Sequence, residues 1–364
     1  MLKIFKFIFL FSIIFVLSVF IFLNSFYQFG SPPNKEKLLS FKNSNNFDEG
    51  KFYNHYELPR VSLDKNNPEE NESNLKNWFF PPKNKNPSSP LPSISFDKNE
   101  LTLAKFSWLG HSTTLMNIND LIIMTDPVFN RASPIPIFGK PFAYENTTTI
   151  DDLPKISVVI LSHDHYDHLD AKAIKAFSNN VDYFIVPLGV KGHLVHWGVE
   201  SNKITELDWY ESHNYQDINF ILTPAQHFSG RSFSDQNKTL WGSWVIKSDD
   251  LNIFFSGDSG YTEEFKKIGN DFGPFDLAFI ECGGYHSTWA DIHMFPYEVV
   301  QTSIDLKAKL FVPISWAKFD LSLHNWNEPI IRVTKEAKTR NVNISTPQIG
   351  EVFNLSQPPN ENWW

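Results

Sequence analysis

The most informative stretch of this sequence reads Val158-Val159-Ile160-Leu161-Ser162-His163-Asp164-His165-Tyr166-Asp167-His168. Its apolar run predicts a buried strand, and the six residues from His163 to His168 contain three imidazoles and two carboxylates. Imidazole and carboxylate groups together suit zinc and neighbouring transition ions. Ligands at both ends of so short a loop can hold two ions close together. The competing interpretation is a solvated polar turn.

Short β-rich runs recur after Leu101 and alternate with helical patterns, which indicates a mixed α/β domain and not a repeat array. The expected strands include Lys105 to Leu109, Leu121 to Thr125, Ser157 to Leu161, Tyr183 to Val186, Asn219 to Thr223, Trp244 to Lys247, Asn252 to Ser256 and Leu277 to Ile280. The expected helices include Ala171 to Ala176, Gly189 to Trp197, Thr262 to Ile268 and Pro296 to Leu306.

Composition limits the kind of protein and the kind of site. A chain of 364 residues with 41% hydrophobic residues can bury a substantial core. Its formal charge of −9 and its lack of a long basic stripe argue against a nucleic-acid partner. The single cysteine, Cys282, excludes an internal disulfide and a cysteine-rich zinc site, so a metal would depend on His, Asp and Glu.

The N-terminal residues 1–30 are predicted to be a transmembrane anchor or a signal segment. An apolar stretch reaches about Leu23, with Lys3 and Lys6 near its start. No small-x-small cleavage pair follows, which favours a retained anchor over a cleaved signal peptide. The two lysines would then stay in the cytoplasm, and the body of the protein would face the extracytoplasmic side.

The rest of the chain divides by composition. Residues 31–100 are rich in Asn, Lys, Pro and Ser and are expected to be irregular. Part of this region is expected to wrap the domain, because Phe79, Phe80 and the segment Tyr53 to Leu58 carry apolar side chains. A folded domain is expected over residues 101–355, followed by a tail at 356–364.

Two further loops carry a candidate ligand near the end of a strand. His227 lies in Thr223-Pro224-Ala225-Gln226-His227-Phe228-Ser229-Gly230, and Asp258 lies in the turn Gly257-Asp258-Ser259-Gly260. The order His-x-His-x-Asp-His, then a lone His, then this Asp resembles the ligand order of the metallo-β-lactamase superfamily.

Several other motifs narrow the resemblance to the branch with N-acylphosphatidylethanolamine-hydrolysing phospholipase D. They are Trp108-Leu109-Gly110-His111-Ser112-Thr113, Thr125-Asp126-Pro127-Val128-Phe129, Arg131-Ala132-Ser133-Pro134, Leu240-Trp241-Gly242-Ser243-Trp244 and Phe272-Gly273-Pro274-Phe275-Asp276-Leu277. The resemblance covers roughly Asn45 to Phe353 and implies an αββα sandwich with metals at one edge.

The resemblance also implies roles for individual residues. His163, His165 and His227 match the ligands of a first zinc ion, Asp167 and His168 match those of a second, and Asp258 matches the carboxylate that bridges both. A water shared by the two ions would lose a proton near neutral pH and become the nucleophile.

One expected ligand is missing. The family usually has a histidine on the second metal where this chain has Ser315, in Val312-Pro313-Ile314-Ser315-Trp316. A serine hydroxyl is a poor zinc ligand. The second site is therefore weaker, completed by water, suited to a harder ion, or empty. His324, nine residues further on, is one candidate replacement.

Three more residues are candidates for the site. His293 matches a histidine near the substrate phosphate in this branch, where it would donate a proton; a structural hydrogen bond is the alternative. His111 is expected near the site, as an accessory group or a buried polar anchor. Arg231 is expected to contact an anionic substrate or to be a surface residue.

The sequence therefore predicts a membrane-anchored, zinc-dependent phosphodiesterase acting on a phospholipid-like substrate through a metal-bound hydroxide, with Asp167 also orienting the attacking water. A lactonase or amide hydrolase is the alternative within the enzymes, because the same branch resembles L-ascorbate 6-phosphate lactonase. A non-catalytic scaffold on a degenerate metal site is the alternative of another class, prompted by Ser315.

Overall fold

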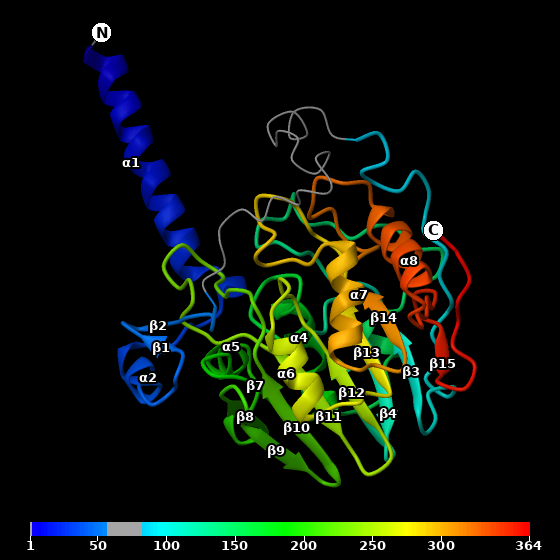
Figure 1. The fold of residues 1–364 in the computed structure, drawn as a ribbon. Coiled ribbons are helices and arrows are strands. Elements are labelled where there is room, and N and C mark those ends of the chain that lie inside the picture. Colours follow the sequence, from blue (N-terminus) through cyan, green and yellow to red (C-terminus); the bar gives the residue numbers. More distant parts are fainter. Residues whose placement is uncertain (1, 57–81) are drawn as a thin grey trace.

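Two β-sheets face each other in the middle of the molecule (Figure 1). This computed structural model describes residues 2–56 and 82–364. The seven-stranded sheet has the order β15 (Val352–Asn354), β3 (Lys105–Trp108), β4 (Thr114–Ile118), β5 (Leu121–Thr125), β6 (Ile156–Ile160), β7 (Val181–Pro187) and β8 (Ile204–Leu207). The six-stranded sheet has the order β14 (Phe311–Ile314), β13 (Leu277–Glu281), β12 (Asn252–Phe255), β11 (Ser243–Lys247), β10 (Ile218–Thr223) and β9 (Ser212–Tyr215).

Helices cover the outer sides of both sheets. They are α4 (Ala171–Phe177) and α5 (Lys191–His196) beside the first sheet, and α6 (Glu264–Asp271), α7 (Pro296–Asp305) and α8 (Glu328–Arg340) beside the second. The N-terminal part adds the short helix α2 (Lys35–Ser40) and the hairpin β1 (Phe47–Asp48) with β2 (Lys51–Phe52). The expected mixed α/β class is confirmed, with its layers in the order α, β, β, α.

Strand β6 shows how the sequence builds these layers. Val158 and Ile160 point into the core between the two sheets, whereas Val159 points into the second core beneath α4 and α5. Successive strand residues face opposite sides of a sheet, so a continuous apolar run is required when both faces are covered. The apolar run before the histidine cluster is therefore a central strand, as expected.

The strand directions bring distant loops to one edge. β5, β6 and β7 run parallel in the first sheet, and β12, β13 and β14 run parallel in the second. Parallel strands end on the same side, and loops that follow them gather there. Loops after β5, β6, β12 and β14 carry Asp126, the 163–168 cluster, Asp258 and Ser315, respectively.

The apolar N-terminal stretch forms helix α1 (Leu2–Ser25), which projects away from the two sheets (Figure 1). A membrane-spanning helix must be both long and sufficiently apolar to match the hydrocarbon layer. Among the described residues, no helix meets both conditions. The prediction of a transmembrane anchor is therefore not supported. The orientation inferred from Lys3 and Lys6 is not supported either, because it presupposes that anchor.

Phe79 and Phe80, expected to wrap the domain, lie outside the described residues.

Candidate metal centre

The histidine cluster forms a tight loop between β6 and α4. The amide groups of His168 and Leu169 both donate to the carbonyl of His165, at 3.1 and 2.8 Å. Asp170 then caps α4, because its side chain accepts two amide hydrogens from the first turn of the helix. A central strand and a capped helix thus fix both ends of the loop.

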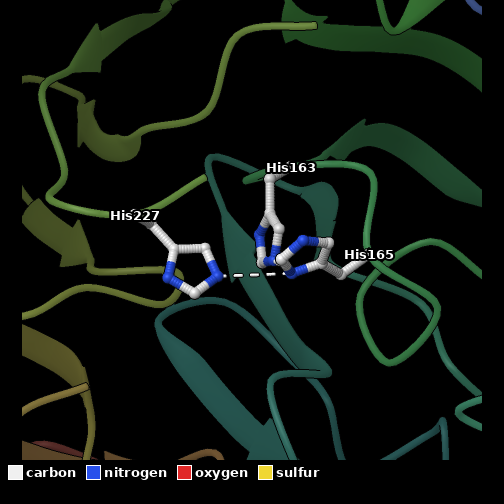
Figure 2. Close-up of side chains that lie close together, drawn as sticks. All are labelled: His163, His165 and His227. Atoms are coloured by element: carbon white, nitrogen blue, oxygen red, sulfur yellow. Dashed lines mark hydrogen bonds between the residues drawn. The ribbon is translucent and has the colours of Figure 1, made fainter. Parts of the chain in front are cut away.

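Three imidazoles from two loops converge (Figure 2). His163 Nε2 lies 2.9 Å from His165 Nδ1, and His227 Nε2, from the loop after β10, lies 3.3 Å from the same atom. Figure 2 shows the three ring edges directed toward a common point. This is the trio predicted to hold the first ion.

A second group adjoins the trio. His168 Nε2 lies 3.0 Å from Asp258 Oδ2 and 3.7 Å from Asp167 Oδ2. His163, His168 and Asp258 each offer a ligand atom within 4.8 Å of the others, so the two groups share a boundary. All six residues predicted as ligands therefore meet in one place.

The electrostatics of the site suit a cation. Burial lowers the pKa of His163, His165 and His227, and neighbouring imidazoles lower that of His163 and His227 further. These rings are neutral near pH 7 and keep a lone pair free. Burial alone would raise the pKa of Asp258, but the positive charge that His168 carries in the metal-free site outweighs this effect and holds the carboxyl ionised.

The donor set fits a divalent metal. Neutral imidazoles and an ionised carboxylate are the ligands that zinc takes in proteins without cysteine. His168 Nε2 is buried and, among the described residues, has no hydrogen-bond partner, although Asp258 is close. Buried polar atoms are rarely left unpaired, so an atom of this kind at the centre of converging ligands is suited to coordination.

Asp126 fixes His168 from behind. This fully buried carboxylate lies 2.7 Å from His168 Nδ1 and also accepts the amide and hydroxyl of Ser162, at 2.7 and 2.6 Å. A carboxylate on one ring nitrogen sets the tautomer and directs the other nitrogen toward a metal. In the sequence Asp126 was noted only as part of a motif; its role behind His168 was missed, although its place at the end of a strand could have suggested it.

Arg231 has a different place from the one predicted. Its guanidinium is buried and donates to the backbone carbonyls of Asp164, Leu169 and Gln28, at 2.6 to 2.9 Å. It also stacks over the Tyr166 ring at 4.1 Å. Arg231 therefore ties the metal-binding loop to the segment after α1 and does not line the cavity described below, so neither substrate contact nor a surface position is correct.

Asn54 is a further residue that sequence reasoning missed. Its side-chain amide donates to the carbonyl of His227 at 2.8 Å, and its side-chain oxygen accepts the His227 amide at 3.2 Å. These reciprocal bonds, together with the Ile292 carbonyl 3.1 Å from His227 Nδ1, set the position of the ring. No local pattern in the sequence connects residues so far apart.

Four of the six predicted ligands open onto a cavity of about 350 Å³. His165, Asp167, His227 and Asp258 line it, together with His111, His293, Ser315 and His324, and aromatic residues form much of the remaining wall: Phe228, Trp289, Trp316, Phe319 and Trp326. A concave, largely apolar site with a few convergent polar groups is typical of small-molecule binding.

His293 lies beside Asp258 with a partner that the sequence did not reveal. Its Nδ1 is 4.0 Å from Asp258 Oδ2 and 3.6 Å from Oε2 of Glu281, a completely buried residue at the end of β13. Burial raises the pKa of Glu281 to about 7, and although burial lowers the pKa of His293, Glu281 and Asp258 raise it to about 9.

The other accessory candidates differ in how close they lie to the predicted ligands. Ser315 Oγ donates to Asp258 Oδ1 at 3.2 Å and lies 2.7 Å from Ser112 Oγ. His324 lines the cavity, but its ring stacks on Tyr285 and, among the described residues, it belongs to none of the clusters of close ligand atoms. His111 does belong to one, with Asp167 and His168.

Comparisons with known proteins agree with the fold. Residues 122–316 match the family model for the beta-lactamase superfamily domain. An uncharacterized protein of Mycobacterium tuberculosis is 37% identical over 286 residues, which are 76% of this chain and 77% of that protein. The N-acyl-phosphatidylethanolamine-hydrolyzing phospholipase D 1 of Caenorhabditis elegans is 34% identical over 287 residues, covering 73% of this chain and 80% of the relative.

A solved structure has the same fold. A metallo hydrolase from the archaeon Ignicoccus hospitalis superposes with a TM-score of 0.52 at 18% sequence identity, covering 68% of this chain and 97% of the other. The expectation drawn from the order of the ligands is confirmed by the family match and by this fold. The chain belongs to the beta-lactamase superfamily and has the fold of its metal-dependent hydrolases.

Proposed function

We propose that this protein is a zinc-dependent phosphodiesterase of the phospholipase D type, with two ions in its site. The observation that carries the proposal is the meeting of six potential ligands, four of which line one cavity of about 350 Å³. The diester substrate is proposed because a relative at 34% identity is named for hydrolysis of N-acyl-phosphatidylethanolamine.

Three residues would hold the first ion: His163, His165 and His227. Asp167 and His168 would bind the second, with Asp258 between the two. When bound, such ions polarise a water molecule and the phosphoryl oxygens of the substrate.

The protein's own groups would order the reactants. Asp167 lies 3.0 Å from His111 Nε2 and faces the cavity, so its carboxylate is positioned to orient a water on the metal side. His293, with Nδ1 directed at Glu281, keeps its proton at neutral pH, because its pKa is about 9. It would donate that proton to the departing oxygen of the substrate.

The cavity wall favours a substrate with an apolar part. Phe228, Trp289 and Phe319 line the same space as the predicted ligands. Such a wall lowers the local dielectric, which strengthens interactions between the charged groups and a phosphodiester. It would also accept the apolar part of a phospholipid-like molecule next to the headgroup.

The test is a substrate panel on the full-length protein. Bis-p-nitrophenyl phosphate, an N-acylated phosphatidylethanolamine and a simple lactone are compared before and after chelation. We expect chelator-sensitive cleavage of the two diesters and loss of this turnover in Asp258→Asn. Asp320→Asn, in the same cavity but bonded to Lys85 and outside the ligand clusters of the described residues, is the matched control and should stay active.

Other outcomes of the panel would replace the proposal. Cleavage of the lactone alone would make the protein a lactonase with the same metal site. Absence of turnover on all three substrates, with intact folding and bound metal, would favour the scaffold interpretation.

A further inference from the structure

The second ion of the proposed site lacks one expected ligand in the sequence, because Ser315 stands where the resemblance to the superfamily implies a histidine. The structure shows that the Ser315 hydroxyl is already engaged. It donates to Asp258 Oδ1 at 3.2 Å and lies 2.7 Å from Ser112 Oγ. A neutral hydroxyl in this position helps to orient Asp258 and is a poor zinc ligand in its own right.

His111 comes to the same place from another element. It lies in the loop between β3 and β4, and its side chain is 5% exposed. Its Nε2 lies 3.0 Å from Asp167 Oδ2, and its ring centroid is 5.0 Å from that of His168. His111, Asp167 and His168 offer ligand atoms that all lie within 4.8 Å of one another.

Hydrogen bonds fix the backbone of His111 and so define the position of its ring. Its φ of +52° is a left-handed conformation that few non-glycine residues adopt. Two bonds to its carbonyl oxygen stabilise it: one from Trp108 Nε1 at 2.6 Å, and one from the amide of Ser315 at 2.9 Å. The backbone amide of Ser315 therefore helps to position His111.

The two other histidines of the cavity are less suitable. His324 stacks on Tyr285 with ring centroids 4.6 Å apart, and its Nδ1 lies 2.9 Å from the Asn325 carbonyl. Its ligand atoms are not within reach of the cluster among the described residues. His293 groups with His227 and Asp258, which places it beside the first ion and not beside Asp167 and His168.

We propose that His111 is a direct ligand of the second metal ion and takes over the position that Ser315 has vacated. The second ion then has two imidazoles and two carboxylates, from His111, His168, Asp167 and Asp258. Imidazole nitrogens and carboxylate oxygens are the donors that zinc takes in proteins without cysteine. The inference rests on the proposed binuclear site, and it adds that the missing family ligand does not leave the second position open.

A different role for His111 must be separated from coordination. The distance of 3.0 Å to Asp167 Oδ2 also suits a hydrogen bond, through which His111 would only orient that carboxylate. Glutamine can keep such a bond, because its amide nitrogen donates, but its carbonyl oxygen is a weak zinc ligand. His111→Gln therefore distinguishes a ligand from a positioning residue.

The experiment measures metal binding and not turnover. Metal-free full-length protein is titrated with Co²⁺ while ions bound per chain and histidine N–H proton signals shifted by the metal are counted. We expect two ions for the wild type. His111→Gln and His111→Ala should bind the first ion normally and the second at least 100-fold more weakly. Once the Co²⁺ concentration is high enough to fill both sites, they should show one shifted histidine signal fewer than the wild type. His324→Ala is the matched control and should bind two ions.

A rescue variant protects the test against simple misfolding. His111→Ala combined with Ser315→His restores an imidazole at the family position and should recover the second ion. Two ions of unchanged affinity in His111→Gln would overturn the proposal, and so would loss of both ions together in that variant. A wild type that binds no ion would instead contradict the proposed function, whereas one that binds a single ion would contradict the rebuilt second site.

Discussion

Replacing Asp126 by asparagine removes the carboxylate that directs His168 toward the metal. In the wild type this carboxylate receives the amide and hydroxyl of Ser162 and lies 2.7 Å from His168 Nδ1. Asparagine has the same shape, but its amide nitrogen cannot accept a hydrogen bond. One of the three donors is therefore left without an acceptor, or His168 takes the wrong tautomer.

The size of the effect follows from the partners involved. Loss of an orienting carboxylate behind a metal-binding histidine costs about 10- to 100-fold in metal affinity, and an unpaired buried group costs about 1–3 kcal/mol of stability. We expect Asp126→Asn to bind zinc more weakly by that factor. The metal-free variant should also unfold at lower urea concentration, with a free energy of unfolding reduced by about 1–3 kcal/mol.

Zinc affinity is measured by competition with a chromophoric chelator, and stability by urea unfolding of the metal-free protein. Asp152→Asn is the control, because Asp152 accepts bonds from Thr149 at the surface and lies outside the metal-binding clusters of the described residues. Unchanged zinc affinity in a folded Asp126→Asn protein would refute the reasoning that Asp126 prepares His168 for coordination.

Three further substitutions test the packing around the site. Burial lowers the pKa of Lys318 from 10.5 to about 7. Between pH 7 and pH 10.5 the unfolded chain therefore binds more protons than the folded one, and stability rises with pH. Over this range the free energy of unfolding of the metal-free wild type should rise by up to about 5 kcal/mol relative to that of Lys318→Met. Parallel stability profiles in urea would contradict this. Arg231→Met, which leaves three carbonyls without their donor, should lower the free energy of unfolding by about 3 kcal/mol, as measured by urea titration; wild-type stability would show that the tie is dispensable. Trp363 stacks on Trp316 at 5.0 Å, and Trp363→Ala should cost about 2 kcal/mol by thermal unfolding, less than a full core value because Trp363 is only partly buried; an unchanged melting temperature would contradict this.

The central strands could be predicted because each is marked in the sequence by a continuous apolar run. The run around Val158 is apolar on both faces, and β6 lies where that run indicated. Strand β14 was missed because Pro313 interrupts it. Proline lacks a backbone amide, and β14 accommodates it because this strand lies at the edge of its sheet. Helix α8 was also missed, although Pro329 at its start and the spacing of Ile330, Val333 and Ala337 give a readable helical signal.

The candidate ligands could be predicted because they lie in short motifs, but the groups that hold them could not. Asp126 and His168 are 42 residues apart, and Asn54 and His227 are 173 apart. Only the folded sheets bring such pairs together. For Arg231 the prediction from residue type was wrong. An arginine suggested contact with an anionic substrate, but the folded chain buries its guanidinium against backbone carbonyls.

The most direct test of the account is reconstitution of the metal-free, full-length protein. Zinc is added in known equivalents, and both bound metal and hydrolysis of bis-p-nitrophenyl phosphate are followed. The account predicts no turnover without metal, activity that rises with added zinc, and saturation of both quantities at two ions per chain. Diester hydrolysis that persists after complete removal of metal would contradict it.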